Sequence, residues 1–132
     1  MSSENVEIAR RAYEAFNAGD ISGWLALHSR DAELHDLAVL PGAAVHRGHA
    51  ELQTWAEQMI ETAEDLRFEP QRFIEAGEFV LVHVRATGKG RGSGAPGEIS
   101  FFHVAEFGDG KIRRLRSYLT EDEALEAVGL RE

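Results

Sequence analysis

Asp36 ends a strand-like segment, "SRDAELHD", and places a carboxylate where a half-buried strand would carry an apolar side chain. Because side chains alternate along a strand, Ala32, Leu34 and Asp36 share one face. In a cavity of low dielectric, burial raises the pKa of a carboxylic acid and lowers that of an imidazole, unless the two groups pair. An Asp–His pair can take a proton alpha to a carbonyl or activate a water molecule. Asp36 is therefore the first candidate for a general base.

Two later strand-like segments bring further polar groups. In "EFVLVHVRATG", His83 and Arg85 share one face and a fully apolar set occupies the other. In "EISFFHVAEFG", His103 lies on a face that is otherwise apolar. The residues leave three interpretations open. Asp36 and the imidazoles form an acid–base site, or the pocket binds a molecule without chemistry. In the third, Asp36 pairs with Arg85 or caps backbone amides, both histidines are satisfied core residues, and the cavity is small or filled.

Two other motifs suggest metal and nucleotide sites. His46 and His49, with Asp36 or His35 as a third ligand, are residue types that bind zinc or iron. However, they lie at a loop-to-helix junction where solvated side chains are expected. The string "GKGRGSGAPG" contains a loose phosphate-loop pattern, but no helix follows it, so it is interpreted as a hairpin tip. We expect neither a metal nor any other cofactor.

Composition limits the function classes. The 132 residues fit one domain, and 43% hydrophobic with 28% charged residues is ordinary for a globular protein. A net charge of −9 disfavours binding to nucleic acid, and the absence of cysteine excludes thiolate chemistry and disulfides. The first residues, "MSSENVEIARRAYEAF", have no unbroken apolar run. We therefore expect a cytoplasmic protein that binds neither nucleic acid nor membrane.

The elements that must position these groups follow from periodicity. Helical spacing predicts helices over about 4–17, from Asp20 onward and within 46–65, and a Thr120/Glu123 capping box starts a last short helix. Alternation predicts one early strand and then a four-stranded antiparallel meander from Leu66. The pattern indicates an α+β domain whose helices pack on one face of a strongly twisted sheet, around a cone-shaped pocket.

Several strings resemble one family in order and spacing: "AYEAFNAGD", "SRDAELHD", "HRGHAEL" and "FGDGKIRRLRSYL". They are similar to the SnoaL-like polyketide cyclase and ketosteroid isomerase-like family of the nuclear transport factor two-like superfamily, over nearly the whole chain. The resemblance implies a single domain over residues 1–132. It implies a cone-shaped α+β barrel with helices in the concave face of a mainly antiparallel sheet. That fold hosts isomerases, cyclases, epoxide hydrolases and plain binding domains.

The resemblance also implies site residues. Asp36 falls where steroid isomerases of the family place the general base, and His103 where they place a second oxyanion donor. Their oxyanion-hole tyrosine corresponds to Ala12, with Tyr13 one residue further and rotated by about 100° on the helix. The catalytic candidates are thus Asp36, His103 as proton partner or oxyanion donor, Arg85 to fix charge, and Tyr13. Strand parity and the resemblance together predict four side chains in one cavity: Asp36, His83, Arg85 and His103.

The resulting function prediction is the binding of a small apolar or amphipathic molecule in the cone, with isomerase- or cyclase-type chemistry centred on Asp36 if the protein is an enzyme. The alternatives are a non-catalytic binding or dimerisation module, and an epoxide hydrolase-like enzyme, for which Asp36 and Arg85 are present but a second acid is missing. The expected ligand-binding residues are His83, Trp24, Trp55, Met59, Phe101, Leu115 and Ser117.

A homodimer through the sheet is also expected. One set of apolar residues would otherwise form an exposed patch larger than monomers usually tolerate. These residues are Val80, Val82, Val84, Phe102 and Val104.

Overall fold

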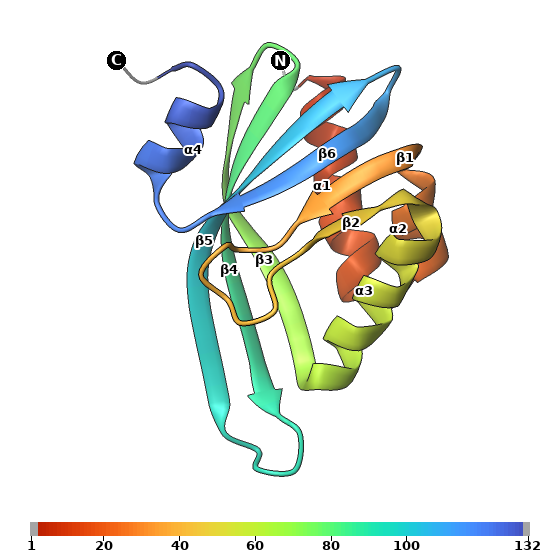
Figure 1. The fold of residues 1–132 in the computed structure, drawn as a ribbon, viewed down its shortest axis with the longest axis vertical. Helices are drawn as coiled ribbons and strands as arrows, with labels where there is room; N and C mark the ends of the chain where they lie inside the picture. The colour runs from red at the N-terminus through yellow and green to blue at the C-terminus, as the bar shows by residue number, and fades with distance from the viewer. Residues whose placement is uncertain (1–2, 131–132) are drawn as a thin grey trace.

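The computed structural model describes residues 3–130, and all of their strands belong to one curved sheet (Figure 1). The helices are α1 (Glu4–Asn17), α2 (Ile21–Ala26), α3 (Gly48–Thr62) and α4 (Glu121–Ala127). The strands are β1 (His28–His35), β2 (Val45–Arg47), β3 (Ala63–Ala76), β4 (Phe79–Gly90), β5 (Pro96–Gly108) and β6 (Lys111–Tyr118). The predicted α+β class is confirmed.

The sheet is mainly antiparallel and open. Its strand order is β2-β1-β6-β5-β4-β3, and only the β1–β6 pair is parallel. Strands β2 and β3 at the two edges do not pair with each other, so the sheet curves as a partial cone without closing into a barrel (Figure 1). Helices α1, α2 and α3 cover the concave face of this open sheet.

Capping residues set the helix starts that the sequence predicts. The Ser3 hydroxyl accepts a hydrogen bond from the amide of Val6 at the start of α1, at 3.0 Å. The Asp20 carboxylate accepts from the amide of Gly23 at the start of α2, at 2.9 Å. Thr120 and Glu123 form the predicted capping box of α4. These local signals fix where three helices begin.

Two boundaries differ from the sequence prediction. The third helix covers only Gly48–Thr62, because the residues before it form strand β2 and those after it begin β3. Strand β2 is three residues long and pairs with β1, with His46 opposite Leu34. Three residues are too few to show an alternation, so the sequence did not indicate this strand.

Helices cover both faces of the sheet, which differs from the expectation of one helix layer. Helices α1, α2 and α3 lie on the concave side, and α4 lies on the opposite side of the sheet (Figure 1). The outer-face residues Leu81, Phe102 and Val104 pack against Ala124 of α4. Helix α4 therefore buries this apolar area of the outer face, and no second subunit is needed to cover it.

The five apolar residues on which the homodimer prediction rests are not exposed. Val80, Val82 and Val84 are fully buried in the concave core, and Phe102 and Val104 lie in the cluster formed with α4. The homodimer stays a prediction without this support. None of the helices formed by residues 3–130 has the length and apolarity needed to cross a membrane.

Candidate functional site

A small cavity lies between the three concave-side helices and the sheet. Ala12 and Tyr13 of α1, Trp24 of α2, Trp55 of α3 and His103 of β5 contribute to its lining. The volume open to the centre of a water molecule is about 30 Å³, which is room for about two waters. Most of the lining is apolar, and none of it carries an acid, a lysine or an arginine.

Tyr13 and His103 form a buried hydrogen-bonded pair in the cavity wall. The Tyr13 hydroxyl lies 2.7 Å from Nδ1 of His103, and the two residues are 8% and 5% exposed. Burial lowers the pKa of His103 to about 3 and raises the pKa of Tyr13 above its usual value. Both side chains are therefore neutral at pH 7. The structure brings together two residues that the sequence analysis named separately.

The direction of this bond follows from what a buried hydroxyl requires. His103 is the only side-chain or backbone partner of the Tyr13 hydroxyl among the described residues. A buried hydroxyl hydrogen without an acceptor is costly, so Tyr13 donates to Nδ1. The neutral imidazole then carries its proton on Nε2. His103 can thus offer an N–H donor to a molecule in the cavity.

Aromatic rings form much of the cavity wall. The rings of Trp24 and Trp55 stack with centroids 5.8 Å apart, and Phe16 lies 5.7 Å from Trp24 and 5.8 Å from Trp55. Leu115 of β6 also lines the cavity. Three of the expected ligand-binding residues, Trp24, Trp55 and Leu115, are therefore cavity residues.

The other three concave-side candidates lie around the cavity without lining it. The Phe101 ring stands edge-on to His103, with centroids 4.8 Å apart. Ser117 is the cross-strand neighbour of His103, and Met59 is half-buried against the main core. They support the wall of the cavity, and a larger opening of it would be needed for them to contact a ligand.

Asp36 lies on the concave side at the rim, outside the cavity lining. Its Oδ1 accepts a hydrogen bond from Nε1 of Trp55 at 3.0 Å, and its Oδ2 accepts from the amide of Ala44 at 3.2 Å. Nε2 of His46 lies 3.0 Å from the same Oδ2. Asp36 lies on the same side of the sheet as the cavity but does not line it, so the prediction that its side chain points into the cavity is wrong. Its hydrogen bond to Trp55 connects it to the cavity wall.

The prediction that His83 and Arg85 point into the cavity is wrong. Opposite His103 stands Val82, while His83 pairs with Phe102 on the outer face. Directly opposed residues share a face, so His83 and Arg85 lie on the convex side.

The two polar side chains find partners there. Nε2 of His83 lies 2.6 Å from the Ser100 hydroxyl, and Arg85 donates to Glu98 at 2.9 Å. Arg85 consequently cannot fix charge near Asp36, which removes the arginine from the Asp–Arg arrangement expected of an epoxide hydrolase-like site.

His28 is a cavity residue that the sequence analysis missed. Its ring lines the cavity, and its Nδ1–H donates to the carbonyl oxygen of Trp24 at 2.8 Å. Burial lowers the pKa of His28 to about 4, although the bond to Trp24 acts in the opposite direction. Alternation could not have indicated it, because the register of β1 shifts between His28 and Glu33, and because Arg30, which has the same parity, is exposed.

The histidines of the "HRGH" string bind different partners. His46 contacts Asp36, whereas Nε2–H of His49 donates to the backbone carbonyl of His28 at 3.1 Å. His35, the other proposed third ligand, contacts Glu33 at 3.0 Å. Within residues 3–130, no group of three or more His, Cys, Asp or Glu residues is arranged to hold a metal ion.

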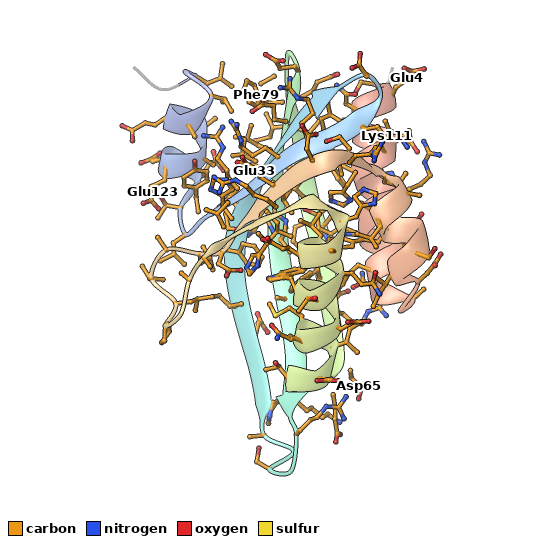
Figure 2. All side chains as sticks on the ribbon, turned by 45° about the vertical axis from the view of Figure 1, so that its right-hand side comes forward. Glu4, Glu33, Asp65, Phe79, Lys111 and Glu123 are labelled. Atoms are coloured by element: carbon orange, nitrogen blue, oxygen red, sulfur yellow. The ribbon has the colours of Figure 1, made fainter. Side chains whose placement is uncertain are left out.

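The arginine-rich β6 segment forms ion pairs on the outer face. Arg114 donates to Glu33 at 3.2 Å, and Arg47 donates to the same carboxylate at 3.1 Å. Hydrogen bonds from His35 and Arg47 lower the pKa of Glu33 to about 2. Glu33 lies on β1 (Figure 2) and is not part of the cavity lining. Exposed pairs of this kind contribute little stability each.

Comparison with known proteins places this geometry in context. The SnoaL-like domain family matches residues 9–115. No curated protein matches the sequence. A nuclear transport factor two-like protein from Burkholderia xenovorans is 30% identical, with 97% of each chain covered and a TM-score of 0.77.

Two further solved structures share the fold at lower identity. One is a protein with a ketosteroid isomerase-like fold from Catenulispora acidiphila in complex with trimethylamine, 18% identical, with 94% of this chain and 93% of that chain covered and a TM-score of 0.77. The other is SalBIII, an epoxide hydrolase/cyclase-like enzyme of pyran ring formation in salinomycin, 19% identical, with 87% and 89% covered and a TM-score of 0.76.

Proposed function

Because this chain belongs to the SnoaL-like domain family, we propose that it binds a small, neutral, apolar or amphipathic molecule in the cavity beneath α1, α2 and α3. The observation that carries the proposal is the buried Tyr13–His103 pair in an otherwise mainly apolar wall. An apolar cavity supplies affinity, and a few fixed polar groups orient the ligand.

The charge state of the cavity favours a neutral ligand. Tyr13 keeps its proton and His103 does not gain one at neutral pH, so the lining offers no charge to offset the desolvation of an ion. The Nε2–H of His103 can donate to a carbonyl, hydroxyl or ether oxygen. These groups act in binding and orientation, because neither is a strong base.

Trp55 is the part of the wall best placed to move for a larger ligand. In this structure the cavity holds only about two waters, so a ligand of more than a few heavy atoms must displace part of its lining. Trp55 and Leu115 are the lining residues that are not fully buried. The single hydrogen bond of the Trp55 indole goes to Asp36 at the rim. Outward rotation of this ring would widen the cavity toward Asp36.

Tryptophan fluorescence tests the proposal directly. The chain has two tryptophans, and both line the cavity, so their emission reports on its contents. We expect saturable changes in emission with members of a panel of small ketones, lactones, steroids and epoxides. Failure of every class to change either the emission or the melting temperature would contradict a binding function.

A matched pair of variants locates the binding. Ala105→Val adds two methyl groups to the cavity wall, whereas Ala86→Val adds them at a buried alanine on the same concave face outside the lining. We expect Ala105→Val to weaken binding by about tenfold or more because it fills the small cavity, and Ala86→Val to leave affinity unchanged. Equal effects of the two changes would contradict binding in this cavity.

A second candidate function is acid–base catalysis of the isomerase or cyclase type. The observation that favours it is the contact between Asp36 and His46 at the rim, 3.0 Å apart and next to the movable Trp55. Asp36 could accept a proton from a ligand that enters past the displaced indole. No cofactor is required for such a step.

Asp36→Asn distinguishes the two candidates once a ligand is known. Asparagine keeps an oxygen for the Trp55 indole but cannot act as a base, so a catalytic Asp36 predicts a loss of turnover of about a hundredfold or more with binding retained. Turnover that is unchanged in the variant would exclude Asp36 as the base. Binding without conversion in the wild type would favour the non-catalytic module.

A further inference from the structure

The two cavity histidines present opposite hydrogen-bonding atoms. The carbonyl oxygen of Trp24 can only accept, so Nδ1 of His28 carries the hydrogen in the 2.8 Å bond between them. The neutral ring then has a lone pair on Nε2. His103, by contrast, accepts at Nδ1 and carries its hydrogen on Nε2. One imidazole is an acceptor and the other is a donor.

The acceptor of His28 is buried and unpaired. Nε2 of His28 has no hydrogen-bond partner among the described residues, and the residue is only 2% exposed. His28 nevertheless belongs to the cavity lining, and the centroids of its ring and the Trp24 ring lie 4.6 Å apart. Nε2 itself has almost no exposed surface, so a ligand reaches it when the wall opens. A buried acceptor without a donor is a cost that the fold sustains, and a ligand that donates to it would relieve that cost.

We propose that His28 is a specificity-determining residue that selects ligands carrying a hydroxyl or N–H donor, with the donor bound to Nε2 of His28 and an acceptor atom of the ligand bound to Nε2–H of His103. This inference rests on the proposed binding function and narrows its ligand class to alcohols, phenols, enols and related donors. A plain ketone, ether or epoxide can satisfy His103 alone, and it leaves the acceptor of His28 unpaired.

Cyclohexanol and cyclohexanone form the test pair, because they share a ring and differ mainly in the hydroxyl hydrogen. Cyclohexanone absorbs weakly at the excitation wavelength of tryptophan, so the emission is corrected with free tryptophan at the same ligand concentrations. Kd values then follow from the corrected emission of Trp24 and Trp55. The measured quantity is the ratio of the two Kd values in each variant. Comparing that ratio between proteins cancels the different hydration of the two compounds.

Two substitutions separate the two nitrogens of His28. His28→Asn places an amide near the position of Nδ1 and can still donate to the Trp24 carbonyl, but it removes the acceptor at Nε2. His28→Gln places an amide oxygen near the position of Nε2 and keeps an acceptor there. Thermal unfolding of both variants shows that each is folded before binding is compared.

We expect His28→Asn to reduce the preference for cyclohexanol by about tenfold relative to the wild type, and His28→Gln to retain most of it. Saturable binding of both compounds with the same ratio in all three proteins would overturn the role of His28 and leave the binding function standing. Absence of binding by either compound would overturn the ligand class proposed here, while lactones, steroids and the other compounds of the wider panel still test the binding function.

Discussion

The Tyr13–His103 pair is the feature of the cavity whose energetics can be measured without a ligand. Tyr13→Phe removes the hydroxyl that donates to Nδ1 of His103 over 2.7 Å and leaves that nitrogen buried without a donor. The loss combines a net hydrogen bond with the cost of an unpaired buried acceptor. We expect the free energy of unfolding to fall by about 1–3 kcal/mol.

The reciprocal change gives the coupling between the two groups. His103→Phe leaves the Tyr13 hydroxyl without an acceptor, and we expect a loss of similar size. In the double variant both positions are apolar and nothing polar is left unpaired, so it should be more stable than the sum of the single losses predicts, by about 1–2 kcal/mol. This coupling energy measures the interaction between the two side chains separately from the packing changes that each single substitution causes.

Urea unfolding followed by tryptophan emission measures all three variants, because Trp24 and Trp55 both lie at the cavity. Tyr118→Phe is the matched control, since Tyr118 is the other tyrosine of the chain, lies half-buried on the outer face and packs beside the α4 cluster. A cost of Tyr13→Phe no larger than that of Tyr118→Phe, or strict additivity in the double variant, would refute the buried pair.

Three further predictions follow from other parts of the molecule. Burial lowers the pKa values of His103 and His28 to about 3 and about 4 in the folded protein. In the unfolded chain both histidines bind protons below about pH 6.5. The free energy of unfolding should therefore fall with decreasing pH, by about 1.4 kcal/mol per pH unit for each histidine between about pH 6 and pH 4. His103→Phe should remove one of these two contributions to the slope, and an unchanged slope would show that His103 is protonated in the folded state. Thr120→Ala breaks the capping box of α4 and should cost about 1 kcal/mol in thermal unfolding, unless the packing of α4 alone holds the helix. Sedimentation equilibrium at micromolar concentration checks the homodimer, which a species of only 14.6 kDa would contradict.

Local sequence determined the four helices and all of the strands except the three-residue β2. Helix caps such as Asp20 and the Thr120 capping box act over three residues, so they can be recognised without knowledge of the fold. Alternation correctly grouped Ala32 and Leu34 as buried residues of β1, and Asp36, one residue beyond the strand, bonds to Trp55 on the concave side. The α+β class follows from the order of these elements.

The tertiary structure decided which face of β4 the cavity uses. Both faces of "EFVLVHVRATG" begin with apolar residues, because α4 buries part of the outer face while the concave face forms the main core. Periodicity gives two sets of side chains but not the side of the sheet to which each belongs. The β4–β5 register, with Val82 opposite His103, placed His83 and Arg85 on the outer face.

The tertiary structure also assembled the cavity pair. Tyr13 and His103 are 90 residues apart, and their contact depends on how α1 lies across the curved sheet. His28 lines the cavity where the start of β1 lies beside α2, and its Nδ1–H bonds to Trp24 of that helix. Spacing along a chain reports the direction of a side chain within its own element. The distance between side chains of different elements depends on packing that only the folded chain establishes.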